Sequence, residues 1–165
     1  MPLHLVFMGV SGTGKTAVGR PVSQRLGLEF LEGDELHPPS NIAKMSSGTP
    51  LTDEDRRPWL REIADWTRDR VAEGRDTGVT CSALRRAYRD VLREGAPDTT
   101  FVHLVGPAEL ILERMKSREH FMPPSMLDSQ LDTLEPLEED ERFVTVDISA
   151  PVDELVEDLV TRFRG

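Results

Sequence analysis

The stretch LHLVFMGVSGTGKT, residues Leu3–Thr16, joins a strand-like apolar run directly to a G-x-x-x-x-G-K-T motif. Its glycines let the backbone wrap around a phosphate with the N–H groups pointing inward, in conformations that a Cβ atom disfavours. A helix that begins after the motif directs the positive end of its dipole at the same phosphates. The stretch therefore predicts a strand–loop–helix unit that binds a nucleoside triphosphate.

The groups of this loop have distinct expected roles. The main-chain N–H groups surround the phosphates, the Lys15 ammonium reaches the β- and γ-phosphates, and the Thr16 hydroxyl ligates Mg²⁺. A Gly-rich turn before an ordinary helix is the alternative, and the apolar run in front of the motif argues against it. The residues expected to bind the nucleotide are Gly9, Val10, Ser11, Gly12, Thr13, Gly14, Lys15 and Thr16.

The composition is that of one soluble globular domain spanning residues 1–165. Of these residues, 38% are hydrophobic and 30% are charged, and no apolar stretch approaches the roughly 18 residues that span a bilayer. The N-terminus lacks a basic region followed by a cleavable apolar segment, so we expect no secretory signal. The single cysteine, Cys81, excludes an internal disulfide bond and fits a reducing compartment. We therefore expect a cytoplasmic protein with no membrane segment.

The charge balance is acidic, with 20 Lys and Arg against 30 Asp and Glu and a net charge of −10. Such a surface repels nucleic acid, and the sequence has no basic stripe interleaved with aromatic residues. Much of the excess acid lies in residues 135–141, which we interpret as a solvated loop. Arginines concentrate between Arg56 and Arg93, which indicates a pocket for a small anion.

Strand-like and helix-like segments alternate along the chain, which predicts an α/β fold around a parallel sheet. The last helix is the clearest, because its apolar residues recur with the helical period. A capping box beginning at Thr52 marks the start of a long helix. The expected strands are Leu3–Met8, Leu28–Leu31, Gly78–Cys81, Thr100–Val105 and Phe143–Ile148. The expected helices are Lys15–Leu26, Asp53–Glu73, Arg85–Arg93, Ala108–Lys116 and Val152–Phe163.

Two carboxylates, Glu32 and Asp34, follow the second expected strand. In an open α/β sheet, ligands bind at the carboxyl ends of the strands, so both side chains would face the γ-phosphate. A carboxylate there can orient or deprotonate an attacking hydroxyl, or help to hold Mg²⁺ through water. A solvated Glu-Gly-Asp turn is an equal alternative from these residues alone.

Arginines further along could bind an anionic acceptor. Arg57 lies near a helix start and could present its guanidinium to a carboxylate as a bidentate fork. The alternative is a surface helix with i,i+4 ion pairs. Arg85 and Arg89 follow the third expected strand and lie one helical turn apart on a single face.

A mobile lid is expected at about residues 114–125. Cations cluster there, among them Arg118 and His120, and signals for helix or strand are few. Such a segment suits a lid that closes over a transferring phosphate. His120 alone would be weak evidence, because isolated histidines are usually structural.

Taken in order, several segments resemble the gluconate kinase family of small P-loop kinases. The two most specific strings are G-D-x-L-H-P at Gly33–Pro38 and D-R-x-P-W-L at Asp55–Leu60. The similarity extends from about Leu3 to Ile148, although Glu32 stands where the family commonly has aspartate. The other segments that carry it are Gly9–Thr16, Asn41–Met45, Gly48–Leu51, Cys81–Leu84, Tyr88–Asp90, Leu92-Arg93, His120–Pro123, Ser129–Leu131 and Thr133–Glu135.

This resemblance implies ATP-dependent phosphorylation of D-gluconate at its terminal hydroxyl, with Mg²⁺, to give 6-phospho-D-gluconate. It also implies a P-loop kinase fold of the nucleoside-monophosphate-kinase type, with a five-stranded parallel sheet flanked by helices and a lid. By the same resemblance, adenine would rest near Asp147–Pro151. Family members are often homodimers, but no pattern in the sequence indicates an interface.

The resemblance also assigns roles to the candidate residues. Lys15, Asp34 and Arg118 would be catalytic, with Asp34 as the base or the hydroxyl-orienting group. The residues expected to bind the acceptor are Asp34, His37, Lys44, Arg57, Arg85, Arg89 and His120.

Two other functions remain open at this point. A kinase for another small sugar acid, or for a shikimate-like acceptor, would share Lys15, Thr16 and Asp34. A shikimate kinase should lack the two specific strings, whereas a kinase for another sugar acid would have nearly the same sequence. An ATP-binding regulator without turnover would bind nucleotide but release no ADP when an acceptor is added.

Overall fold

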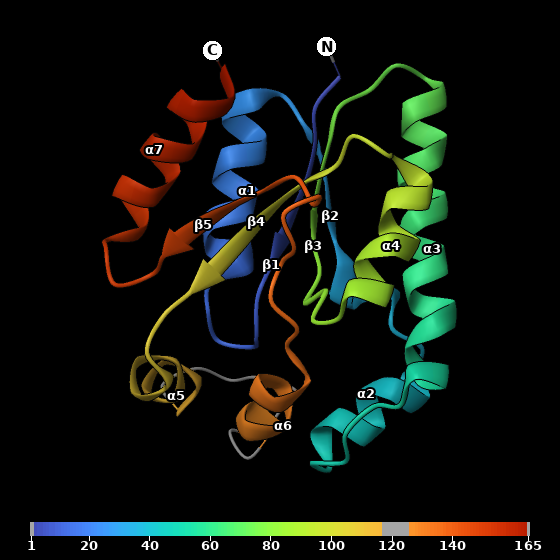
Figure 1. Ribbon diagram of the computed structural model, residues 1–165, viewed down its shortest axis with the longest axis vertical. Coiled ribbons are helices and arrows are strands. Elements are labelled where there is room, and N and C mark those ends of the chain that lie inside the picture. Colours follow the sequence, from blue (N-terminus) through green and yellow to red (C-terminus); the bar gives the residue numbers. More distant parts are fainter. Residues whose placement is uncertain (1, 117–125, 165) are drawn as a thin grey trace.

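Five parallel strands form one sheet in the order β2-β3-β1-β4-β5 in the computed structural model, which describes residues 2–116 and 126–164 (Figure 1). All four pairings between neighbouring strands are parallel. The strands are β1 (His4–Met8), β2 (Glu29–Glu32), β3 (Thr77–Thr80), β4 (Thr100–Val105) and β5 (Phe143–Asp147). The predicted five-stranded parallel sheet is confirmed, and each strand lies within one residue of its expected bounds.

Helices cover both faces of the sheet. In Figure 1, α1 and α7 lie side by side on one face, and α3 and α4 lie together on the other. The helices are α1 (Lys15–Leu26), α2 (Pro39–Ser46), α3 (Asp53–Ala72), α4 (Arg86–Gly95), α5 (Ala108–Lys116), α6 (Met126–Thr133) and α7 (Val152–Arg164), with a 3₁₀ helix η1 (Gly33–Leu36) after β2. The five predicted helices are confirmed to within two residues at either end.

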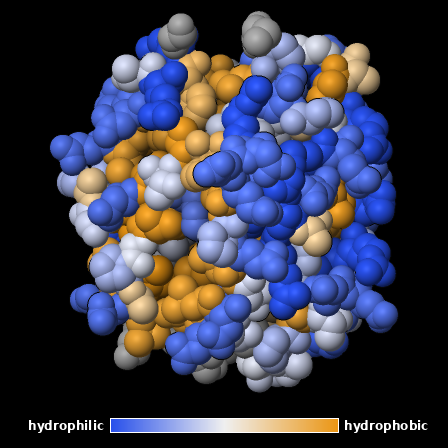
Figure 2. Space-filling model, in the orientation of Figure 1, coloured by the Kyte–Doolittle hydropathy of each residue, from blue (hydrophilic) through white to orange (hydrophobic). Residues whose placement is uncertain are grey.

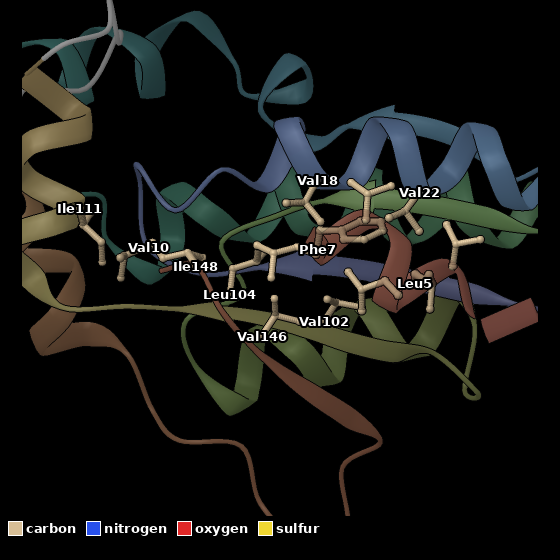
Figure 3. Close-up of a cluster of buried hydrophobic side chains, with 14 of the residues drawn as sticks. Leu5, Phe7, Val10, Val18, Val22, Val102, Leu104, Ile111, Val146 and Ile148 are labelled. Atoms are coloured by element: carbon tan, nitrogen blue, oxygen red, sulfur yellow. The ribbon is translucent and has the colours of Figure 1, made fainter. Parts of the chain in front are cut away.

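The central strand β1 separates two apolar layers because successive side chains of a strand point to opposite faces. Leu5 and Phe7 face α1 and α7, in the cluster that Figure 3 shows. Val6 and Met8 face α3 and α4. All four side chains are buried, so β1 reads as a continuous apolar run, as expected for a strand covered on both faces.

Local sequence signals explain how the helices on these faces begin and pack. The Thr52 hydroxyl accepts a hydrogen bond from the N–H of Asp55, whose carboxylate accepts one from the N–H of Thr52, so the predicted capping box is present. Gly19 lies inside α1 because a Cβ atom there would come within 2.9 Å of the Phe7 ring. The glycine therefore lets α1 approach the sheet closely.

Three short elements, η1, α2 and α6, were not predicted from the sequence. Each of the two missed α-helices has eight residues, a length at which isolated helices are marginal and tertiary packing supplies most of the stability. These three elements nevertheless contribute residues at the carboxyl ends of the strands.

The surface of the molecule differs in hydropathy between its two sides. In the orientation of Figure 1, the side carrying α3 and α4 is largely hydrophilic, whereas apolar residues are visible on the side of β5 and α7 (Figure 2). Among the described residues, no helix is both long and apolar enough to cross a bilayer.

Candidate active site at the carboxyl ends of the strands

A cavity of about 300 Å³ lies at the carboxyl ends of β1, β2 and β3. Residues from many parts of the chain line it: the loop after β1 and the start of α1, the end of β2 and the turn after it, α2, the segment before α3, α3, the loop after β3, and α6. The polar and charged lining residues are Ser11, Lys15, Thr16, Glu32, Asp34, His37, Arg56, Trp59, Ser82, Ser129 and Gln130. The position agrees with the rule that open α/β sheets bind ligands beyond the carboxyl ends of their strands.

The phosphate-binding loop between β1 and α1 has the backbone conformation that its glycines allow. Gly9 has a φ of 148°, and a Cβ atom there would lie 2.8 Å from the carbonyl oxygen of Leu104. The Lys15 ammonium donates hydrogen bonds to the carbonyl oxygens of Gly9 (3.0 Å) and Val10 (3.2 Å). Burial lowers the pKa of Lys15, and the carboxylate of Asp34 opposes that shift. The loop thus holds one ammonium group at the cavity wall.

Glu32, at the end of β2, and Thr16, in the first turn of α1, lie next to each other in the cavity lining. The Thr16 hydroxyl donates a hydrogen bond to the Glu32 carboxylate, which also accepts one of 2.7 Å from the Thr80 hydroxyl. A hydroxyl and a carboxylate are oxygen donors, the ligand type that Mg²⁺ prefers. No cluster of three or more His, Cys, Asp or Glu side chains suited to a metal occurs among the described residues. Two protein oxygens fit a Mg²⁺ ion that also binds substrate phosphates and water.

The 3₁₀ helix η1 and the residue that follows it place Asp34 and His37 in the lining of the same cavity. The Trp59 indole N–H donates a hydrogen bond of 2.8 Å to the carbonyl oxygen of Gly33, which ties η1 to α3. The His37 ring stacks on Trp59 with a centroid distance of 3.8 Å and an interplanar angle of 18°. Burial, and then the charge of Arg56, lower the pKa of His37 to about 4. His37 is therefore neutral at physiological pH.

Arg56 lines the cavity, whereas the sequence pattern predicted its neighbour Arg57 as a binding residue. Arg57 is exposed and is not among the lining residues. In a helix, Arg56 shares a face with Trp59 and Ile63, whereas Arg57 points about 100° away. The Arg56 guanidinium donates hydrogen bonds to the Leu51 carbonyl (2.8 Å) and the Tyr88 hydroxyl (3.0 Å). The spacing of Arg56 with the apolar residues Trp59 and Ile63, which predicts a shared helical face, was the sequence signal that could have identified Arg56.

Lys44 and Arg85 lie near the N-terminus of α3, outside the cavity lining. The Lys44 ammonium donates a hydrogen bond of 2.8 Å to the Asp55 carboxylate. That hydrogen bond is the main cause that lowers the pKa of Asp55 to about 2. Arg85 lies 3.8 Å from the Asp53 carboxylate. Both cations are therefore paired with carboxylates of α3.

Arg89 is a structural residue, which corrects its predicted role in binding the acceptor. Its side chain is fully buried and donates hydrogen bonds to the equally buried Glu141 carboxylate (2.7 Å) and the Ala83 carbonyl (3.0 Å). Arg93 lies 3.0 Å from the same carboxylate. The helical face that Arg89 shares with Leu92 points into the protein, not into the cavity.

The acidic run at residues 135–141 is docked on α4, so its interpretation as a solvated loop is wrong in part. Arg86 forms ion pairs with Glu138 (3.0 Å) and Asp140 (2.8 Å), and Glu141 is buried against Arg89. The local excess of acid is therefore balanced by arginines of one helix. This pairing holds the segment between α6 and β5 in place.

Gln130 of α6 is a cavity residue that the sequence analysis did not select. Its side-chain oxygen accepts a hydrogen bond of 2.6 Å from the N–H of Ser11, inside the phosphate-binding loop. The string Ser129–Leu131 belonged to the family resemblance and was the available signal. The predicted lid residues Arg118 and His120 lie outside the described residues.

A parallel sheet in this strand order, with a phosphate-binding loop after β1 and a polar cavity beside it, defines a P-loop kinase. Solved structures agree: the chain is similar to an unliganded sugar kinase from Janibacter sp. HTCC2649 (TM-score 0.93, 54% identity, 98% of this chain and 94% of that chain). It is also similar to a gluconokinase from Sinorhizobium meliloti 1021 (TM-score 0.85, 48% identity, 97% and 90%). A family model described as an AAA domain matches residues 5–137.

Comparison with curated proteins shows to which family of P-loop kinases the chain belongs. The chain is 48% identical to a gluconokinase of Gluconobacter oxydans (strain 621H) over 99% of this chain and 93% of the relative. It is 44% identical to the thermosensitive gluconokinase of Escherichia coli (strain K12) over 92% and 82%. The chain belongs to the gluconokinase family.

Proposed function

We propose that this protein transfers the γ-phosphate of ATP to the terminal hydroxyl of D-gluconate, giving 6-phospho-D-gluconate and ADP. One observation carries the proposal. A single cavity brings the phosphate-binding loop, with Lys15 and Thr16, next to Asp34, His37 and Arg56. The names of the relatives supply the identity of the acceptor.

The loop side of the cavity binds the phosphates. The N–H groups of the loop and the N-terminus of α1 orient the β- and γ-phosphates, and the Lys15 ammonium neutralises their charge. Thr16 and Glu32 would hold Mg²⁺, which when bound adds positive charge at the phosphate oxygens. Catalysis then depends on positioning and on charge stabilisation, because phosphoryl transfer needs little covalent chemistry from the protein.

Asp34 and Arg56, which line the same cavity, would orient the acceptor. Asp34 is the candidate base: the acceptor oxygen forms a bond to the γ-phosphorus, the bond from that phosphorus to the β–γ bridging oxygen breaks, and the hydroxyl proton passes to the Asp34 carboxylate. Arg56 is the best placed cation for the gluconate carboxylate, since it lines the cavity and a guanidinium can bind a carboxylate with two hydrogen bonds. In this proposal Arg56 takes the role that was predicted for Arg57. Roles for Arg118 and His120 in a lid stay predictions, as does a homodimer.

The direct test is ADP release from the purified protein with Mg²⁺ and ATP. D-gluconate should support turnover, and shikimate, other sugar acids and neutral sugars should serve as the comparison set. Turnover with another sugar acid in place of D-gluconate would reassign the acceptor while keeping the kinase chemistry. Nucleotide binding without turnover for any acceptor would contradict the proposal and favour a regulator.

A further inference from the structure

Asn41 of α2 is a buried amide, 2% exposed, that lies behind His37 and outside the cavity lining. Its amide nitrogen donates a hydrogen bond of 2.9 Å to the main-chain carbonyl of Asp55. The same nitrogen lies 3.2 Å from Nδ1 of His37. A carbonyl oxygen can only accept, so the Asp55 carbonyl identifies this atom as the nitrogen and not the oxygen of the amide.

The identity of that nitrogen determines the tautomer of His37. An amide N–H donates to Nδ1, so Nδ1 is the unprotonated ring nitrogen and the proton is on Nε2. Stacking on Trp59 holds the ring plane. Nε2 lies 3.8 Å from Oδ1 of Asp34. The imidazole therefore directs an N–H group at the carboxylate that we assign as the base.

We propose that Asn41 is a positioning residue that locks His37 as its Nε2–H tautomer, so that His37 steers the Asp34 carboxylate toward the acceptor hydroxyl. The inference rests on the proposed function for the role of Asp34, but not for the tautomer. In this tautomer the Nε2–H group can donate to Oδ1 of Asp34 once the 3.8 Å separation shortens in the complex with substrate, since catalytic hydrogen bonds are often long in a protein without its substrate. In the opposite tautomer, a lone pair of Nε2 would face the carboxylate and repel it.

The charged groups around His37 agree with a neutral imidazole. Burial and the charge of Arg56 of α3 disfavour a positive charge on the ring, and Lys15 of α1 and Asp34 of η1 line the same cavity. Asn41, from α2, is uncharged and would lose its hydrogen bond if Nδ1 were protonated. The tautomer is thus set by one amide and one main-chain carbonyl, and not by a titration.

The first test reads the tautomer without any substrate, by ¹⁵N NMR of the histidine ring nitrogens in the full chain at neutral pH. The sequence has four histidines, and the spectrum of His37→Gln identifies the signals of His37. The expected result is an unprotonated Nδ1 and a protonated Nε2 in the wild-type protein. A protonated Nδ1 in the wild-type protein would overturn the inference, and this result does not depend on which acceptor the enzyme uses.

The second test is kinetic and uses Asn41→Asp, whose carboxylate accepts a hydrogen bond from Nδ1 and so favours a protonated Nδ1. The expected result is a kcat lowered by about tenfold or more, with the KM for ATP within about twofold of the wild-type value. His37→Gln places an amide N–H near the position of Nε2–H and should retain more of kcat than His37→Leu. Ser40→Ala, at an exposed position of the same helix, is the matched control.

The two readouts separate the possible failures. If Asn41→Asp moves the ring proton from Nε2 to Nδ1 in the NMR spectrum but keeps a wild-type kcat, the tautomer has no role in positioning Asp34, and the inference is wrong. If kcat falls equally in His37→Leu and His37→Gln, a hydrogen-bond donor at the position of Nε2 does not support catalysis, and the inference is wrong. If the wild-type protein has the expected tautomer but phosphorylates none of the acceptors, the proposed function fails and the tautomer assignment stands.

Discussion

The side-chain oxygen of Gln130 accepts a hydrogen bond of 2.6 Å from the main-chain N–H of Ser11. Helix α6 thereby contributes an uncharged acceptor directly beside the loop that binds the phosphates, although the two residues are 119 positions apart in the sequence. An acceptor in this place has to be neutral, because a carboxylate would repel the phosphates at short range.

Gln130→Glu should therefore weaken ATP binding more than Gln130→Ala does. Both variants change the contact with Ser11, but glutamate still accepts the hydrogen bond and adds a negative charge at the phosphate site. We expect the Kd for ATP, measured by calorimetry, to rise by about tenfold for glutamate and by less for alanine. Asp132→Asn, at an exposed position of the same helix, is the control. Equal Kd values for Gln130→Glu and the wild-type protein would show that Gln130 does not face the phosphates.

Asp34→Asn should abolish most turnover while nucleotide binding is retained. The amide cannot accept the hydroxyl proton, so kcat should fall by about a hundredfold or more, with the Kd for ATP nearly unchanged. Glu35→Gln removes an exposed carboxylate from the next position and should keep the wild-type kcat. A near-normal kcat for Asp34→Asn would exclude Asp34 as the base and leave Glu32 as the next candidate.

Arg56→Lys should raise the KM for the acceptor, whereas Arg57→Ala should not. Lysine keeps the positive charge but loses the planar fork that binds a carboxylate with two hydrogen bonds. A hydrogen bond to a charged group contributes about 1.5–3 kcal/mol, so the KM should rise by about tenfold to a hundredfold. Steady-state kinetics with the acceptor varied at saturating ATP would measure it. A larger effect from Arg57→Ala would restore Arg57 as the carboxylate-binding residue.

Glu141→Gln should destabilise the protein strongly, because it leaves the Arg89 guanidinium buried without a counter-charge. Breaking one partner of a buried ion pair costs about 3–5 kcal/mol, which urea unfolding at neutral pH would detect as a lower midpoint. Arg68→Ala removes an exposed partner of Asp65 and should cost much less. Similar midpoints for the two variants would show that the pair of Arg89 and Glu141 contributes little to stability.

The same carboxylate should make the stability depend on pH. Burial alone would raise the pKa of Glu141, but hydrogen bonds from Arg89 and the main chain lower it below the ordinary value of 4.5. Glu141 binds its proton more weakly in the folded protein, so its contribution is complete above about pH 4.5 and is lost as the pH falls through the lowered pKa. The difference in unfolding free energy between the wild-type protein and Glu141→Gln should therefore shrink below pH 4.5. A constant difference would contradict the lowered pKa.

Much of the fold could be predicted because its signals are local. Helix α1 has the bounds Lys15–Leu26 expected from the sequence, since Gly14 and Gly27 lie at its two ends in the left-handed conformation. The helix at Val152–Arg164 follows from a regular apolar period. The two eight-residue helices, α2 and α6, could not be predicted in this way, because they have few turns and depend on tertiary contacts.

The sequence by itself determined that the protein has a phosphate-binding loop, a parallel α/β sheet and the motifs of a gluconokinase, because neighbouring residues within each motif create these properties. Only the tertiary structure decided which cations face the cavity. Arg56 and Arg57 are adjacent in the chain but point about 100° apart on a helix. Arg89 is buried and donates a hydrogen bond to Glu141, which is 52 positions away in the sequence. Which partner a long charged side chain meets depends on contacts between distant segments, and those contacts exist only once the chain has folded.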